Sequence, residues 1–256
     1  MTAPMFLVPG SALVGGGVGR QVRLTGPEGR HAAQSMRLRP GEVIQVSDGR
    51  GTRAVAVVTE VDRDCLIARV EQVGVEPEPD PQFVLVQALA KGSRDEQAVE
   101  TATELGVDVI VPWQAERSVT VWRGERAEKS RRRWLAVVSA ATKQSRRSRV
   151  PEVREVVDTL GVADVLRAGC LSLVLHETAT SPLAGVPLPT TGVVVLVVGP
   201  EGGISDAELD CFAAAGARPV RLGTEVLRTS SAGPAALAVL CSRSRWGQPD
   251  GPGSGR

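Results

Sequence analysis

The stretch that decides the fold is Val193-Val194-Val195-Leu196-Val197-Val198-Gly199-Pro200-Glu201-Gly202-Gly203-Ile204-Ser205-Asp206. Its first six residues are all apolar, which predicts a strand buried on both faces, as in a parallel sheet covered by helices. Ser205 and Glu208 have the spacing of a capping box, so a helix is expected to begin after the glycines. The loop between strand and helix is either a ligand site or an ordinary turn.

A second stretch of this kind lies at Arg221-Leu222-Gly223-Thr224-Glu225-Val226-Leu227-Arg228-Thr229. A short strand over residues 220–222 ends at a glycine, and the irregular chain that follows exposes backbone N–H and C=O groups. A third predicted strand, over residues 171–175, ends in His176 and Glu177. Parallel strands end at one edge of a sheet, so these ends should form one crevice. His176 fits a structural hydrogen-bonding role better than a catalytic one.

The crevice suits an adenosine-type cofactor that is bound without a phosphate-binding loop. Backbone groups can pair with an adenine edge, Leu222 and Leu227 can enclose the ring, and Glu177 can accept from a ribose hydroxyl. The glycine loop is neither a Walker loop nor a dinucleotide fingerprint, because Gly-Lys-Ser/Thr and Gly-x-Gly-x-x-Gly are both missing there. Arg228 is either a functional cation beside this crevice or a surface arginine that caps a helix or pairs with Glu225.

The composition excludes several classes of protein. The 256 residues carry a formal net charge of +1, so only local charge clusters can indicate a partner. Four separated cysteines and two isolated histidines predict reduced thiols and no metal site. No apolar run approaches the roughly 18 residues of a membrane span, and the start of the chain lacks an export pattern. We therefore expect a cytoplasmic protein that does not enter membranes.

The pattern along the chain predicts two domains. Residues 1–74 carry short alternating strands at about 42–47, 54–61 and 65–70, which predict a small antiparallel β-barrel. The proline-rich acidic stretch within residues 75–81 predicts a stiff linker. Strands and helices then alternate over residues 82–246, and the apolar-poor tail 247–256 is expected to be disordered. Further elements are expected as a helix capped by Ser93 and Glu96 and ended by Gly106, a strand over 107–111 stopped by Pro112, a basic helix over 125–143 and a last helix over 234–243.

A basic cluster lies between Arg123 and Arg149, with ten Lys or Arg and two acidic residues. A solvated charged helix explains part of it, but the one-signed segment over residues 143–149 fits contacts with RNA phosphates. Base stacking should contribute little, since the chain has no tyrosine and few other aromatics. The candidate RNA-binding residues are Arg20, Arg37, Arg39, Lys91, Lys143, Arg146, Arg147 and Arg149.

Several motifs together resemble a known family. They are His31 to Arg37 with Arg39-Pro40-Gly41-Glu42, Lys91-Gly92-Ser93-Arg94 with Thr103-Glu104-Leu105-Gly106-Val107, Gln144 to Pro151, Val198-Gly199-Pro200-Glu201-Gly202-Gly203, and Leu222-Gly223 with Leu227-Arg228-Thr229. The chain resembles a SPOUT-class RNA methyltransferase, and most of all the bacterial family that methylates N3 of a uridine in small-subunit (16S) ribosomal RNA. Ser230-Ser231 and Gly233-Pro234 depart from the family pattern, and the latter pair is expected to interrupt the start of the last helix.

The resemblance implies a fold, a cofactor and partners. It implies an N-terminal PUA-like β-barrel, a C-terminal α/β domain whose parallel sheet contains a deep trefoil knot, a bent S-adenosylmethionine held by the knot loops, and a homodimer acting on ribosomal RNA or the small ribosomal subunit without a metal. Arg228 is the candidate catalytic residue that stabilises the uracil anion, and Glu201 is a candidate base or a brace of the loop. The expected cofactor-binding residues are Leu175, His176, Glu177, Val198, Gly199, Pro200, Gly203, Leu222, Gly223, Val226, Leu227 and Thr229.

Two alternatives stay open at this point. A related SPOUT enzyme could act on transfer RNA or on another atom, including a ribose oxygen. A non-catalytic RNA-binding or ribosome-assembly factor could have kept the same fold. Identification of the methylated nucleotide separates the first alternative, and binding of S-adenosylmethionine separates the second.

Overall fold

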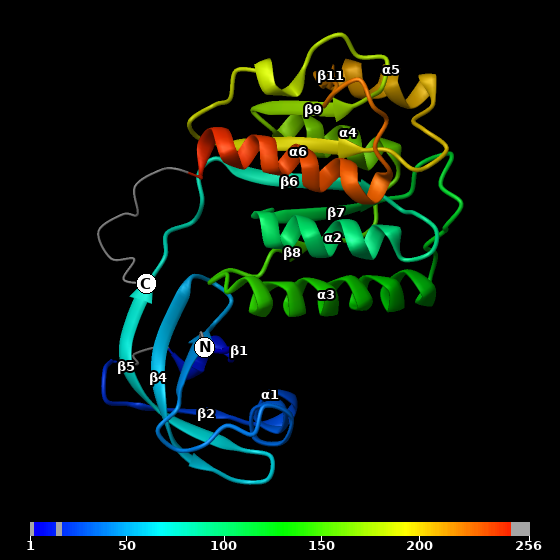
Figure 1. The fold of residues 1–256 in the computed structure, drawn as a ribbon. Helices are drawn as coiled ribbons and strands as arrows, with labels where there is room; N and C mark the ends of the chain where they lie inside the picture. The colour runs from blue at the N-terminus through cyan, green and yellow to red at the C-terminus, as the bar shows by residue number, and fades with distance from the viewer. Residues whose placement is uncertain (1–2, 14–16, 247–256) are drawn as a thin grey trace. The chain divides into compact units, whose positions relative to one another are not determined.

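The computed structural model describes residues 3–13 and 17–246. The described residues divide into two compact units (Figure 1). The N-terminal unit holds residues up to 78 together with residues 142–150, and the C-terminal unit holds residues 79–141 and 151–246. The domain boundaries at residues 74 and 81 stay predictions, and the tail predicted to be disordered, 247–256, lies outside the described residues.

The N-terminal unit is built on one five-stranded sheet in the order β1-β3-β4-β5-β2. The three strands expected from the sequence pair antiparallel as predicted, and the additional strand β1 pairs parallel with β3, which the sequence did not indicate. Alternate residues of these strands, such as Ile44, Val46, Ala56, Leu66 and Ala68, form a buried core. The elements are β1 (Met5–Leu7), a 3₁₀ turn (Gly10–Ala12), β2 (Gln21–Leu24), α1 (Gly26–Arg30), a π turn (His31–Ser35), β3 (Val43–Ser47), β4 (Thr52–Val61) and β5 (Leu66–Val75).

The C-terminal unit contains a six-stranded sheet in the order β11-β9-β10-β6-β7-β8, and every pairing in it is parallel. The predicted α/β fold with a parallel sheet is therefore confirmed. Its elements are β6 (Gln82–Ala88), α2 (Arg94–Leu105), β7 (Val109–Trp113), α3 (Glu125–Ser145, whose last four residues belong to the N-terminal unit), β8 (Glu152–Val153), α4 (Thr159–Ala168), β9 (Leu171–Leu175), a 3₁₀ turn (Leu183–Gly185), β10 (Val193–Val198), α5 (Asp206–Ala214), β11 (Arg218–Val220) and α6 (Thr229–Ser244).

Helices cover both faces of this sheet, as Figure 1 shows. Helices α2 and α6 pack together and contact β6, while α4 packs on β9 and β10 beside α5. Five residues of β10 are buried, which is why its sequence is an uninterrupted apolar run rather than an alternating one. Because these strands are all parallel, their carboxyl ends lie along one edge of the sheet.

Two local predictions about helix and strand ends were wrong. Ser93 precedes α2 as expected but adopts a left-handed conformation, with φ at 60°, and its side chain caps nothing. The side chain of Asp95 accepts a hydrogen bond from the N–H of Glu96 instead, at 2.8 Å. Pro112 lies inside β7 rather than ending it. Its carbonyl accepts a hydrogen bond from the N–H of Val157, which lies beyond the end of β8. No neighbouring strand therefore needs the N–H that proline lacks.

The last helix begins five residues earlier than predicted, at Thr229, and Pro234 lies inside it. Gly233 and Pro234 are buried, and a Cβ on Gly233 would lie 3.3 Å from Leu85 of β6. The pair therefore lets the helix approach the sheet closely instead of interrupting its start. The second capping box is present as predicted, with Ser205 and Glu208 bonded reciprocally at the start of α5.

Candidate functional site

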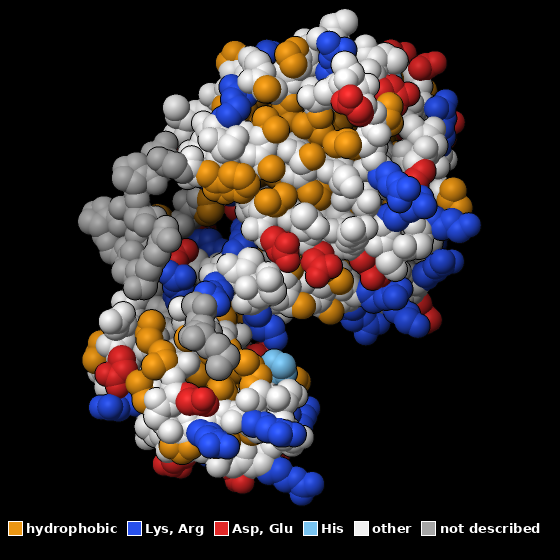
Figure 2. Space-filling view, in the orientation of Figure 1, with side chains coloured by type: hydrophobic (Ala, Val, Ile, Leu, Met, Phe, Trp, Pro, Cys, Tyr) orange, Lys and Arg blue, Asp and Glu red, His pale blue; other side chains and the backbone are white. Residues whose placement is uncertain are grey.

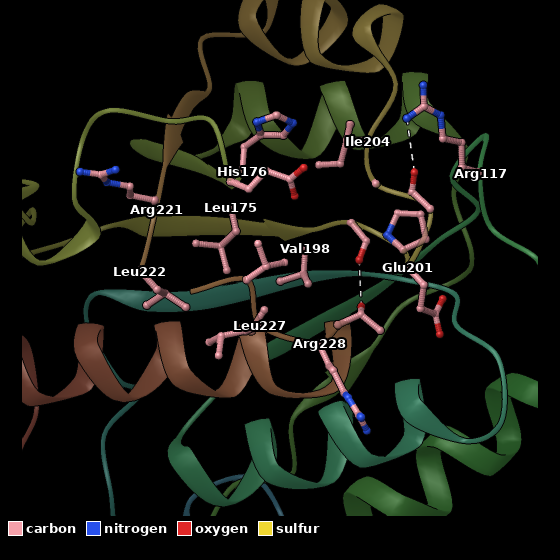
Figure 3. Close-up of a pocket in the computed structure, with 18 of the residues that line it drawn as sticks. Arg117, Leu175, His176, Val198, Glu201, Ile204, Arg221, Leu222, Leu227 and Arg228 are labelled. Carbon is pink, nitrogen blue, oxygen red and sulfur yellow. Dashed lines mark hydrogen bonds between the residues drawn. The ribbon is translucent and has the colours of Figure 1, made fainter. Parts of the chain in front are cut away.

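A cavity of about 660 Å³ lies where β9, β10 and β11 end (Figure 3), and we call it the edge cavity. Its volume is in the range of sites for small molecules and cofactors. All of its lining residues belong to the C-terminal unit. The structure brings together every residue proposed from the sequence for cofactor binding or catalysis: Leu175, His176, Glu177, Val198, Gly199, Pro200, Glu201, Gly203, Leu222, Gly223, Val226, Leu227, Arg228 and Thr229.

The glycine loop after β10 follows a path that side chains would obstruct. Gly203 has a φ of 76°, a left-handed conformation that favours glycine, and its N–H donates to the carbonyl of Pro200 at 2.9 Å. A Cβ on Gly199 would lie 2.6 Å from the side chain of Ile204. The backbone of this loop therefore forms one wall of the cavity directly.

The two loops of the edge cavity are joined by a hydrogen bond that a buried side chain of the central sheet supports. The hydroxyl of Thr229 donates to the carbonyl of Gly199 at 2.8 Å, and the side-chain amide of Gln87 donates to the same hydroxyl at 2.9 Å. Gln87 is fully buried in the central strand β6. Thr229 thus connects the start of α6 with the end of β10, which fixes the spacing of the two loops.

A buried carboxylate supports the glycine loop from behind. Glu208 is 3% exposed and accepts hydrogen bonds from the N–H of Glu116, the N–H of Ser205 and the hydroxyl of Thr159, at 2.8, 2.9 and 3.1 Å. The hydroxyl of Ser205 donates in turn to the carboxylate of Glu116 at 2.6 Å. These bonds hold three separate loops around the start of α5.

Glu201 is engaged at the rim of the cavity. Its carboxylate lies 3.0 Å from the guanidinium of Arg94 and also accepts from the N–H of Lys91 at 3.4 Å. These contacts favour the role of a brace over that of a base. In the first turn of α2, burial raises the pKa of the Asp95 carboxyl, and hydrogen bonds from the N–H groups of Glu96 and Ala90 oppose that rise.

Arg228 occupies the N-cap position of α6 but makes no side-chain cap hydrogen bond. Among the described residues it forms no ion pair with Glu225, so neither structural alternative for this arginine is seen. Figure 3 places Arg228 and Glu201 on the side of the pocket opposite His176. The ring of His176 bonds to the hydroxyl of Thr178 at 2.9 Å, as expected of a structural histidine.

The structure adds cavity residues that the sequence did not indicate. Most are neighbours of the two motifs, but Arg94 and Arg117 come from distant segments. Arg117 donates to the carbonyl of Gly202 at 3.3 Å (dashed in Figure 3), and a Cβ on Gly202 would lie 3.0 Å from the Cβ of Arg117. The sequence around Glu116-Arg117 contains no motif that predicts a place in a ligand site. The added residues are Arg94, Arg117, Gly202, Ile204, Asp206, Val220, Arg221, Glu225 and Ala232.

The candidate RNA-binding residues are not brought together in one unit. Lys91 belongs to the C-terminal unit and the other seven to the N-terminal unit. Lys143 forms an ion pair with Glu28 at 2.6 Å. Arg149 donates to the carbonyls of Glu76 and Pro77, at 2.7 and 3.3 Å. At least these two cations therefore hold parts of the N-terminal unit together, and their role in RNA binding stays a prediction.

Neither a metal centre nor a membrane span is seen in the described part of the chain. No group of three or more His, Cys, Asp or Glu there could hold a metal ion. None of its helices combines the length and apolar character that crossing a membrane requires. The four cysteines are all free thiols.

Comparison with known proteins assigns a class to this arrangement. Residues 76–241 match the model of an RNA methyltransferase domain, and residues 24–71 match that of an RNA methyltransferase PUA domain. Proteins called ribosomal RNA small subunit methyltransferase E are similar along most of their length. Those of Mycobacterium bovis and Mycobacterium tuberculosis are each 46% identical over 226 residues, which cover 86% of both chains.

Solved structures agree with this result. A ribosomal RNA small subunit methyltransferase E from Neisseria gonorrhoeae, bound to S-adenosyl methionine, superposes with a TM-score of 0.85 at 29% identity, covering 95% of this chain and 98% of that one. A methyltransferase from Legionella pneumophila in complex with the same cofactor gives 0.83 at 28% identity, covering 95% and 99%. The chain therefore belongs to the RNA methyltransferase family that includes these small subunit methyltransferase E proteins.

Proposed function

We propose that this protein transfers a methyl group from S-adenosylmethionine to N3 of a uridine in small-subunit ribosomal RNA. Membership of the family supports methylation of RNA, the relatives at 46% identity are named as small-subunit ribosomal RNA methyltransferases, and the Neisseria gonorrhoeae structure holds S-adenosyl methionine. The observation that carries the proposal is the edge cavity, because the predicted cofactor residues all line it. A cytoplasmic location follows as the expectation for an enzyme that acts on bacterial ribosomal RNA.

The residues present fit an adenosine-type cofactor. No backbone hydrogen bond within the described chain uses the N–H or C=O of Leu222, Gly223 or Leu227, so these groups are available to a ligand. Val198, Leu222 and Leu227 supply apolar walls beside them. Unpaired backbone groups between apolar side chains are what recognition of an adenine ring requires.

The chemistry needs a methyl donor and a stabilised nucleophile. S-Adenosylmethionine, when bound, supplies an electrophilic methyl group. The N3 proton of uracil is weakly acidic, and the nitrogen becomes nucleophilic as that proton passes to water. The guanidinium of Arg228 stabilises the negative charge that develops on the ring or holds the nucleotide in place. The pair of Glu201 and Arg94 holds the glycine loop, and Thr229 keeps the two loops at a fixed spacing.

Methylation of an unmodified small-subunit ribosomal RNA tests the proposal. We expect one methyl group per RNA, located by mass spectrometry on the base of a single uridine, with calorimetry showing that the protein binds S-adenosylmethionine. A methyl group on a ribose, or transfer only to transfer RNA, would support the alternative SPOUT activity. No binding of the cofactor would indicate a non-catalytic RNA-binding factor.

We also propose that the active form is a homodimer. The side chains of Val226 and Trp246 are 75% and 50% exposed, and Ala235, Ala238 and Val239 lie on the incompletely buried face of α6. Figure 2 shows hydrophobic side chains gathered over this part of the C-terminal unit. Such a surface is typical of a contact between subunits.

Light scattering after gel filtration is expected to give about twice the chain mass of 26.9 kDa. Val239→Glu should yield the monomer, since it places a charge on the proposed contact. Leu160→Glu, a matched change at an exposed apolar residue of α4, should leave the mass unchanged. A wild-type protein that stays monomeric at micromolar concentration would contradict the proposal.

A further inference from the structure

A loop between β7 and α3 borders the edge cavity, and we call residues 117–123 the rim loop. Its first residue, Arg117, lines the cavity. Exposed and less exposed side chains alternate strictly along it. The exposed ones are Arg117, Val119, Val121 and Arg123.

The inward residues fix the rim loop. The side chain of Gln114 donates to the carbonyl of Thr120 and accepts from the N–H of Trp122, both at 3.0 Å. The hydroxyl of Thr120 donates to the carbonyl of Ala90 at 2.8 Å. Trp122 is buried edge-to-face against Trp134 of α3, with ring centroids 5.1 Å apart. The outward side chains are thus displayed on a rigid backbone.

The displayed side chains form an apolar centre with a cation at each end. Val119 is 71% exposed and Val121 is 39% exposed. Single exposed valines are ordinary, but two on one side of a fixed loop between arginines form a surface of defined chemistry. Arg117, at one end, is held over the cavity by its hydrogen bond to Gly202.

Further cations continue from the other end of the rim loop. Arg126 and Lys129 follow Arg123 and are three residues apart, so they share a face of α3. In the described chain none of these three forms an ion pair.

The acidic residues near these cations are partly neutralised. Glu128 lies 3.7 Å from Arg132, Glu96 lies 3.5 Å from Arg133, and Glu125 occupies the first turn of α3. Figure 2 shows Lys and Arg gathered along the edge where α2 and α3 begin.

We propose that the rim loop and the first turns of α3 bind the RNA strand that flanks the target nucleotide. Arg117, Arg123, Arg126 and Lys129 contact its phosphates, and Val119 and Val121 pack against the face of a flanking base. A polyanion whose bases present flat faces for packing matches this alternation of charge and apolar surface better than a protein surface does. The inference rests on the proposed function, because it places RNA beside the cavity proposed to hold the methyl donor.

Binding of a small-subunit ribosomal RNA transcript, measured by filter retention at several salt concentrations, tests the inference. The slope of log affinity against log salt is negative. Arg123→Gln with Arg126→Gln should reduce its magnitude by about 1.4 to 1.8, the value for two lost phosphate contacts. Val119→Ser with Val121→Ser should weaken binding about fivefold and leave the slope unchanged. The controls are Arg167→Gln with Arg218→Gln and, for the apolar change, Leu160→Ser, all exposed residues of the same unit outside the edge cavity.

The outcomes separate this inference from the proposed function. Affinity for S-adenosylmethionine and the unfolding transition should match wild type in every variant, which shows that the fold and cofactor site are intact. An unchanged salt slope in the arginine variant overturns the inference, even if the enzyme methylates uracil N3. A loss of the dimer in the valine variant also overturns it and assigns the loop to a protein contact. If the modified atom proves to be another one, a reduced slope still supports the RNA-binding surface.

Discussion

Replacing Arg228 with alanine is expected to lower the rate of methyl transfer by about a hundredfold to a thousandfold while changing the affinity for S-adenosylmethionine less than about twofold. The rate falls because loss of a single group that stabilises developing negative charge typically costs a factor of 10² to 10³. Cofactor affinity persists because the groups proposed to bind it, at Leu222, Gly223 and Leu227, belong to the backbone. The side chain of Arg228 makes no helix-capping bond, so α6 should remain intact.

Single-turnover transfer of a labelled methyl group, together with calorimetry, measures these two effects separately. Arg221→Ala is the matched control, because Arg221 lines the same cavity and Figure 3 shows its side chain on the far side from Arg228. That variant should keep most of the activity. Equal losses in both variants would indicate a general electrostatic contribution, and unchanged turnover in Arg228→Ala would refute the catalytic assignment.

Replacing Glu208 with alanine is expected to lower the free energy of unfolding of the C-terminal unit by about 3 kcal/mol. The change leaves the N–H groups of Glu116 and Ser205 and the hydroxyl of Thr159 without their buried acceptor, and unsatisfied buried donors cost about 1–3 kcal/mol each before relaxation. The glycine loop loses its support at the same time. Affinity for S-adenosylmethionine should therefore fall as well.

Tryptophan fluorescence during urea titration follows this effect, since all four tryptophans belong to the C-terminal unit. Asp210→Ala on the same helix is the control, because that carboxylate is exposed and its loss should cost less than about 0.5 kcal/mol. Equal stability of the two variants would mean that the contacts of Glu208 are not what holds these loops.

The central sheet could be predicted from the sequence because its strands are buried on both faces. The runs at 171–175 and 193–198 coincide with β9 and β10 as observed. Strand β8 has only two residues, too few to show any periodicity. The early start of α6 was missed because Gly233 and Pro234 normally disfavour a helix, whereas the close approach of Gly233 to Leu85 is visible only in the structure. The trefoil knot stays a prediction of the family resemblance.

In the candidate site, too, the residues of local motifs could be predicted from the sequence, whereas those brought in by tertiary contacts could not. Glycines and strand ends identify the backbone walls, since their conformations are local properties of the sequence. Arg94 and Arg117 were missed because they reach the cavity only through tertiary contacts with Glu201 and Gly202. Conversely, the one-signed segment 143–149 suggested phosphate binding, and only the structure shows that Lys143 and Arg149 have partners within the N-terminal unit.

The hydrogen bond between Gln87 and Thr229 joins residues 142 positions apart. Arg245, still later in the chain, donates to the carbonyls of Gly106 and Pro81, each at 2.6 Å, and lies over the ring of Phe83. During translation, β6 and the residues just before it can therefore form these contacts only after almost all later residues of the C-terminal unit have been synthesised. A nascent chain that has not yet released Thr229 from the exit tunnel lacks the residue that joins the two loops of the edge cavity.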